Sequence, residues 1–282
     1  MEASDRADTV AARGPWRAIA RAARKRGSAI FAYHGVDRLP ISQDPELLCI
    51  PPDRFRSHLA LLVEAGYEFV TVTEFVERAP VPGLIAVSFD DGLANLGTVA
   101  LPIMQELGVA GTVYVPTGLI GQAYPWATAE SGLRIMDGDE IRTLANAGWE
   151  IGAHGVTHRD LSRCSYDESM AEMTESREAL ERLIDRKVTS FAYPYARYSE
   201  TAERAARDAG FSAAVSYFRL ARDNDRYAFP RHPVTVQHGR ASILLKVVGR
   251  YDALIASPPA QLAGLLTRRL RPRPKAPLRP RV

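Results

Sequence analysis

Short apolar runs alternate with helical segments along most of this chain, and that alternation restricts the folds open to it. Residues 29–33, 84–89 and 111–115 have the length of buried strands, and helices between such runs end at glycines such as Gly66. The run at 84–89 is apolar at nearly every position, which is typical of a parallel strand covered on both faces. About seven β/α units predict a parallel sheet, and closure into a barrel fits that number.

The remaining segments continue the alternation. A long connection at residues 116–138 is rich in Gly, Pro and aromatic residues, and connections of this length inside compact domains tend to be functional. Ser165 and Glu168 form a capping-box pattern at the start of one helix. Further strands are predicted at 69–72, 149–153, 190–192 and 212–215, and helices around 55–65, 96–107, 139–147, 165–183 and 199–209.

The distribution of charge argues against nucleic acid as a partner. The formal net charge is +3, but seven Lys/Arg and no acid lie in residues 267–282, so the rest of the chain carries −4. A nucleic-acid-binding protein would carry a basic face on its body, so we expect no nucleic-acid partner.

Two basic ends flank the predicted single barrel domain, which we place at residues 29–250. Residues 1–28 form a predicted extension, with Trp16 and Ile19 on the apolar face of a short basic helix. This helix either packs on the body or contacts a membrane surface. Residues 251–282 form a Pro/Arg-rich tail that we expect to be disordered at its end.

Membrane-spanning and secreted classes do not fit this sequence. No apolar run approaches the ~20 residues of a membrane span. Arginines interrupt the N-terminal region where a secretory signal would have its apolar core. We therefore expect a cytoplasmic protein, with peripheral contact at the inner membrane surface as an additional possibility. Two cysteines are too few for a disulfide framework, and Cys164 is expected to be an ordinary thiol rather than a metal ligand.

Polar residues follow several of the predicted strands. Asp90 and Asp91 come directly after the run at 84–89, and His154 and His158 follow a later strand. In α/β barrels, residues just beyond the C-terminal ends of strands converge on one face. Asp-Asp-Gly alone is typical of a turn, and His-x-x-x-His alone is ambiguous. Together, each at a strand end, the two groups predict a metal site.

The residue types in these groups suit hydrolysis. One carboxylate and two imidazoles can hold a divalent cation with one coordination position open. Adjacent carboxylates cannot readily bind one small cation in the same orientation, so the second acid can act as a base. A cation with these ligands can lower the pKa of bound water toward ~7 and polarise a carbonyl. We expect Zn²⁺, with Co²⁺, Mn²⁺ or Fe²⁺ as alternatives.

From about Ala29 to His232 the chain resembles the polysaccharide deacetylases of the NodB-homology type, carbohydrate esterase family 4. The resemblance is carried by the order of Tyr33-His34, Ser88–Gly92, His154–His158 and Phe191–Tyr195. It implies a distorted (β/α)7 barrel and removal of an N-acetyl group from an amino sugar by hydrolysis of a linear amide bond.

The resemblance also implies roles for individual residues. Asp90 would be the general base, and Asp91, His154 and His158 the metal ligands. The backbone N–H of Tyr195 would stabilise the oxyanion together with the metal.

The last motif of the family should supply a histidine that protonates the leaving amine. The only candidate there is His232, which we take as the general acid, with Arg231 contributing to the site by positioning Asp90. His34 is the alternative acid.

Some positions depart from the family pattern. Gly155 replaces a hydroxyl residue, and Thr157 can supply the loop-bracing hydrogen bond instead. Ala192 stands where an arginine often orients the base, and Ala196 replaces a common glycine. These departures leave open a catalytically silent sugar-binding barrel. A metal-free glycosidase using Asp90 is a further alternative, but it leaves both histidines unexplained.

The substrate is the least constrained element. A cytoplasmic enzyme would meet an N-acetylated sugar, an oligosaccharide or a lipid-linked saccharide. The basic ends mildly favour the lipid-linked form, because they suit an anionic membrane surface.

Overall fold

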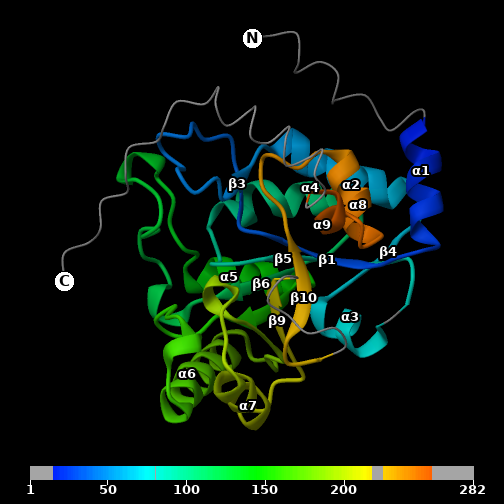
Figure 1. Cartoon of the computed structure of the whole chain (residues 1–282). Helices are drawn as coiled ribbons and strands as arrows, with labels where there is room; N and C mark the ends of the chain where they lie inside the picture. Colours follow the sequence, from blue (N-terminus) through cyan, green and yellow to red (C-terminus); the bar gives the residue numbers. More distant parts are fainter. Residues whose placement is uncertain (1–14, 80, 218–224, 256–282) are drawn as a thin grey trace.

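Seven parallel strands close into a barrel, which confirms the predicted fold (Figure 1). The structure is a computed structural model that describes residues 15–79, 81–217 and 225–255. Each strand of the ring pairs in parallel with the next, and the last pairs with the first. In ring order the strands are β1 (Ala29–Tyr33), β5 (Leu84–Phe89), β6 (Thr112–Val115), β7 (Glu150–Ala153), β8 (Ser190–Ala192), β9 (Ala213–Tyr217) and β10 (Phe229–Pro233).

β5 is fully enclosed in the barrel. All six of its side chains are buried. β1 pairs along one edge of β5, with Tyr33 opposite Phe89. The other edge pairs first with β4 (Glu68–Val70) and then with β6. Side chains on the two faces of β5 pack in two different apolar clusters, so both faces are buried, which explains the continuous apolar run in the sequence. The strand delivers Asp90 to the C-terminal end of the barrel.

The predicted C-terminal boundary of the strand at 69–72 is wrong. β4 ends at Val70, and the helix α3 (Val72–Arg78) begins two residues later. Thr71 caps this helix, because its side chain accepts a hydrogen bond from the Glu74 N–H and the Glu74 side chain binds the Thr71 N–H. The capping box overrides the β-branched character of the segment.

Helices cover the barrel, and the predicted ones are present. The capping box at Ser165 and Glu168 is confirmed at the start of the longest helix. The helix predicted at 96–107 begins as a π-turn over Leu96–Ala100 and continues as α4. The covering helices are α2 (Pro52–Glu64), α4 (Leu101–Glu106), α5 (Gly138–Asn146), α6 (Tyr166–Ile184), α7 (Glu200–Asp208), α8 (Arg240–Val247) and α9 (Tyr251–Ile255).

The long connection at 116–138 folds over the C-terminal end of the barrel. It contains two short 3₁₀ turns, Thr117–Leu119 and Ala129–Ser131. Its Tyr124, Leu133 and Ile135 form a small apolar cluster with Cys49 and Leu93. Cys49 belongs to a two-stranded sheet of β2 (Gly35–Val36) and β3 (Cys49–Ile50), which the sequence did not predict.

The basic helix predicted near the N-terminus is α1 (Pro15–Arg24), and it packs against α2 and α8. Ala20 and Ala23 are buried there, which fits the packed alternative. The tail predicted to be disordered, from Thr267 onward, lies outside the described residues. Within the described residues, no helix combines the length and the hydropathy needed to cross a bilayer.

Candidate metal centre and active site

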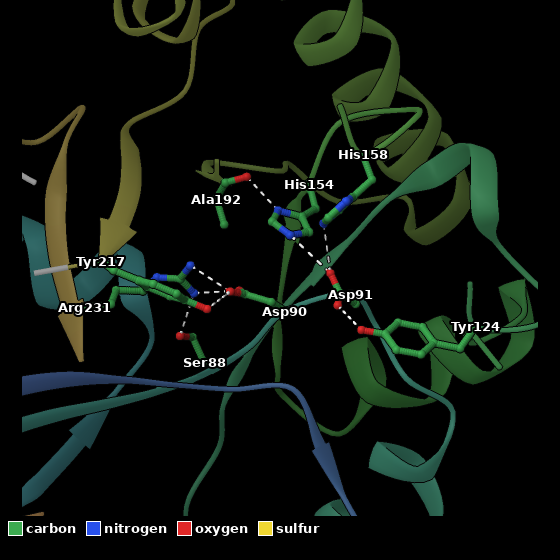
Figure 2. Close-up of polar contacts among 9 residues, drawn as sticks. All are labelled: Ser88, Asp90, Asp91, Tyr124, His154, His158, Ala192, Tyr217 and Arg231. Carbon is green, nitrogen blue, oxygen red and sulfur yellow. Dashed lines mark hydrogen bonds and ion pairs between the residues drawn. The ribbon is translucent and has the colours of Figure 1, made fainter. Parts of the chain in front are cut away.

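Asp90 and Asp91 stand at the point where β5 leaves the barrel. The Asp90 N–H donates to the carbonyl of Tyr33, which extends the β1–β5 pairing by one residue. Asp91 (φ 66°) and Gly92 (φ 63°) then adopt the left-handed conformation and turn the chain sharply. The two neighbouring carboxylates therefore leave the strand in different directions, as Figure 2 shows. Both are almost completely buried.

Asp91 meets the two histidines that follow β7. Its Oδ1 lies 3.4 Å from His154 Nε2 and 3.1 Å from His158 Nε2. One ligand atom from each of the three residues lies within 4.8 Å of the others, and all three side chains are buried (Figure 2). The sequence prediction that these residues converge agrees with this geometry.

Second contacts fix the orientation of His154. Its Nδ1 lies 2.7 Å from the carbonyl oxygen of Ala192 in β8. A carbonyl only accepts, so Nδ1 carries a proton, and Nε2 is the ring nitrogen that faces Asp91. Ala192 departs from the family pattern in its side chain, but its backbone carbonyl positions His154, a predicted ligand.

The cluster has the chemistry of a cation site. Asp91 Oδ1 is buried and has no hydrogen-bond partner among the described residues. Burial opposes ionisation of Asp91, but the contacts with His154 and His158 hold its pKa well below the usual range. Burial also lowers the pKa of His158, although Asp91 partly opposes this. A buried carboxylate is costly unless its charge is compensated, and a divalent cation held by Asp91 and the two imidazole nitrogens would offset that cost.

Glu172 of α6 supports the loop that carries both histidines. Its Oε2 accepts hydrogen bonds from the N–H groups of Val156 (2.7 Å) and Thr157 (2.9 Å), and its Oε1 accepts from Thr157 Oγ1 (2.5 Å). Gly155 has φ 77°, and a Cβ there would lie 2.8 Å from Glu172 Oε2. The departure to glycine therefore makes room for this buried carboxylate.

Asp90 is held by a buried guanidinium. Arg231 Nη1 donates to Asp90 Oδ1 (2.7 Å), and Nη2 donates to Oδ2 (2.9 Å). The same arginine donates to Ser88 Oγ, and Tyr217 lies 3.4 Å from Asp90 Oδ2. Burial raises the pKa of Asp90, but the charge of Arg231 outweighs it and the pKa is lowered. Arg231 is fully buried, and its two hydrogen bonds hold the Asp90 carboxylate in one orientation.

Aromatic side chains from two loops surround His158. Trp126 has its ring centroid 4.3 Å from that of His158, and Tyr195 has its centroid 4.7 Å away. Tyr195 is 48% exposed and has φ 57°, so its backbone is held in the left-handed region. Tyr124 donates a hydrogen bond to Asp91 Oδ2 from the same long connection as Trp126.

The structure does not bring His232 to this site. Neighbouring residues of a strand point to opposite faces, and Arg231 points into the barrel toward Asp90. His232 therefore faces outward. Burial lowers its pKa to about 4; the charge of Lys246 also lowers this pKa, and the charge of Asp252 partly opposes the shift. The assignment of His232 as general acid does not fit this placement. His34 follows β1 and is half-buried next to Asp90, whose pKa it helps to lower.

Several site residues were missed in the sequence. Tyr124 and Trp126 carried a signal, because the length and aromatic content of the 116–138 connection indicated function. Glu172 and Tyr217 carried none, because only the fold turns Glu172 of α6 back toward the histidine loop and brings Tyr217 of β9 to Asp90. Cys164 is not part of the cluster; its thiol contacts the carbonyl of Asp160.

The protein is thus an α/β barrel with a candidate metal site. An Asp-His-His cluster and an arginine-bound aspartate lie together at the C-terminal end of its strands. Comparison with known proteins makes the class specific. Residues 77–214 match the model of the family described as polysaccharide deacetylase. Residues 77–214, just under half of the chain, therefore carry a polysaccharide deacetylase domain.

Individual relatives extend the match. YxkH of Bacillus subtilis (strain 168), whose name places it among polysaccharide deacetylases, is 23% identical over 215 residues, 74% of this chain and 71% of that protein. A chitin deacetylase of Colletotrichum lindemuthianum is 29% identical over 116 residues, 41% of each chain. The structure of the Streptococcus pyogenes deacetylase PplD in complex with acetate has a TM-score of 0.66 at 22% identity, covering 79% of this chain and 98% of that one. At this identity the structural likeness supports the fold.

Proposed function

We propose that this protein is a metal-dependent N-deacetylase, which hydrolyses the acetamide of an N-acetylated amino sugar to acetate and a free amine. One observation carries the proposal: Asp91, His154 and His158 gather within 4.8 Å of one another beside a separate, arginine-bound Asp90. Zn²⁺ is the proposed ion, with Co²⁺, Mn²⁺ or Fe²⁺ as alternatives for this ligand set. The sugar is free, part of an oligosaccharide or carried on a lipid.

Asp90 serves as the general base in this proposal. A divalent cation held by the three ligands would lower the pKa of a coordinated water and polarise the acetamide carbonyl. Asp90 accepts the proton of the attacking water. Arg231 supports this role in two ways, because it fixes both oxygens of the carboxylate and keeps it ionised before the reaction. The bidentate pair restricts Asp90 to one orientation.

His34 completes the reaction by protonating the leaving nitrogen. Attack by water on the acetamide carbon gives a tetrahedral oxyanion, toward which the backbone N–H of Tyr195 donates. The C–N bond then breaks, acetate forms, and the amine nitrogen takes up a proton. His34 is the proposed donor because it follows the strand beside Asp90, whereas His232 faces the outer helices.

Acetate release from a panel of N-acetylated sugars, with and without chelator, tests the activity. We expect acetate only without chelator, and a loss on the order of 10³-fold in Asp90→Asn. Asp139→Asn is the matched control, because Asp139 is an exposed carboxylate on α5. Metal content without acetate release across the panel would support a silent sugar-binding barrel, and chelator-insensitive cleavage of a glycosidic bond would support a glycosidase. Either result would refute the proposal.

A pair of histidine variants tests the assignment of the acid. We expect His34→Gln to lower kcat by roughly 10²- to 10⁴-fold, the usual contribution of a positioned general acid. His232→Gln should retain kcat, because that side chain lies on the outer face of β10. The reverse pattern would restore His232 to the acid role and remove His34 from it.

A further inference from the structure

An apolar groove of about 390 Å³ lies on the surface between α1 and α8. Ile19 projects into it and is 50% exposed, and Trp16 beside it is only half-buried. Exposed apolar surface of this kind, surrounded by polar residues, commonly marks an interaction site. Its main lining residues are Trp16, Ile19, Ala22, Leu244, Leu245 and Val248.

The rim of the groove is strongly cationic. All five Lys/Arg side chains between Arg17 and Arg26 are exposed, and residues 15–28 contain no acid. In the described part of the chain none of the five forms an ion pair; Arg17 and Arg24 instead donate to backbone carbonyls. Residues 239–251, which include α8, also contain no acid. This concentration of charge contrasts with the mildly acidic body.

An apolar groove with a cationic rim fits the surface of an anionic membrane. Apolar side chains of an interfacial helix enter the boundary between headgroups and acyl chains, while its cations contact lipid phosphates. We propose that α1 and α8 form a docking surface for an anionic phospholipid bilayer.

Charge argues against two other occupants of this groove, which are the C-terminal segment of the same chain and a second copy of the protein. Residues 256–282 of the same chain carry seven cations and no acid. A second copy docking through the same face would bring two cationic rims together. Both arrangements place like charges side by side, whereas lipid phosphates neutralise the rim.

Docking through this surface would leave the candidate active site accessible. Gly27, which follows α1, accepts a hydrogen bond from the N–H of Gly83, just before β5. α1 therefore lies at the N-terminal ends of β1 and β5, as Figure 1 shows, whereas Asp90 follows the C-terminal end of β5. The docking surface does not depend on the proposed hydrolysis, and it can be tested in an inactive protein.

Co-sedimentation of the full chain with lipid vesicles tests the proposal. The probes are phosphatidylcholine vesicles with and without one quarter phosphatidylglycerol. We expect binding only to the anionic vesicles, weakened by about tenfold or more in Ile19→Asp and in Arg21→Glu. Ile41→Asp and Lys187→Glu are matched controls, because Ile41 is more exposed than Ile19, Lys187 is exposed as Arg21 is, and both belong to other surfaces.

Each outcome decides the proposal. Controls that bind like the unmodified chain, together with weakened α1 variants, support it. Unchanged binding of both α1 variants overturns it and assigns any lipid affinity to another basic segment, such as residues 267–282. Absence of binding to anionic vesicles also overturns it. Circular dichroism of each variant ensures that loss of binding is not loss of folding.

Discussion

At the scale of single residues, the candidate ligands depend on the groups behind them. Ala192 fixes the tautomer of His154, and Glu172 holds the loop that ends at His158. Asp91 and His158 also have positive φ, a conformation that non-glycine residues adopt at a cost. Such a backbone persists only where surrounding contacts impose it. The precision of the cluster therefore rests on residues that would never touch a metal ion.

Replacement of Glu172 tests this dependence. Glu172→Gln would keep one amide oxygen for the two backbone N–H groups, but it would put an amide N–H₂ opposite Thr157 Oγ1, which now donates to a carboxylate oxygen. We expect the affinity for Zn²⁺ to fall by roughly 10- to 100-fold, as for other residues that orient ligands. Competition with a chromophoric chelator measures this affinity without any assay of activity. Glu175→Gln, an exposed position on the same helix, is the control; equal affinities for the two variants would contradict the proposed role.

At the scale of elements, one carboxylate connects the strands at the opposite end of the barrel. Glu150, the first residue of β7, accepts hydrogen bonds from Thr73 of α3, Thr112 of β6 and Ser190 of β8. The Thr73 N–H also donates to it. These contacts hold α3 and three neighbouring strands together where the barrel has no catalytic role, so their contribution should be to stability.

Glu150→Ala should therefore destabilise the fold and leave the metal site intact. Removing the shared acceptor leaves several donors unpaired, and we expect a loss of about 3 kcal/mol in the free energy of unfolding. Urea denaturation measures the loss, and zinc affinity in the folded variant should be unchanged. A variant as stable as the unmodified protein would show that water replaces Glu150 without cost.

How far the sequence predicts these elements depends on whether the information is local. β5 and α6 were predictable, because a continuous apolar run and a capping box each lie within one segment. The boundary between β4 and α3 was missed, because Val72 suits a strand and only the Thr71–Glu74 contacts reveal the helix. The outward placement of His232 was not predictable for a related reason. The motif gives its position in the chain, but the face of β10 on which it lies follows from the pairing of Arg231 with Asp90.

At the scale of the whole molecule, several histidines remain neutral inside the fold. Burial lowers the pKa of His58 to about 3 and that of His238 to about 4. Burial, assisted by the charge of Lys246, likewise lowers the pKa of His232 to about 4. In the unfolded chain a histidine has a pKa of about 6.5. Between these values the unfolded chain binds protons that the folded protein does not.

The free energy of unfolding should therefore decrease as the pH falls from about 6.5 toward about 4. Above that window the three histidines are neutral in both states and make no pH-dependent contribution. Urea midpoints measured at pH 7, 6 and 5 test the prediction. His232→Gln should lose less stability across this range than the unmodified protein does. An identical slope in the variant would show that the pKa of His232 is the same in the folded and unfolded states.

The metal content of the purified full-length protein tests the central claim most directly. After loading with Zn²⁺ and removal of the excess, elemental analysis should find about one equivalent in the unmodified protein and in Asp90→Asn. His158→Ala should retain almost none, because it removes one of three ligands. A protein that retains none of Zn²⁺, Co²⁺, Mn²⁺ or Fe²⁺, or a His158→Ala variant that retains as much as the unmodified chain, would contradict a metal centre at Asp91, His154 and His158.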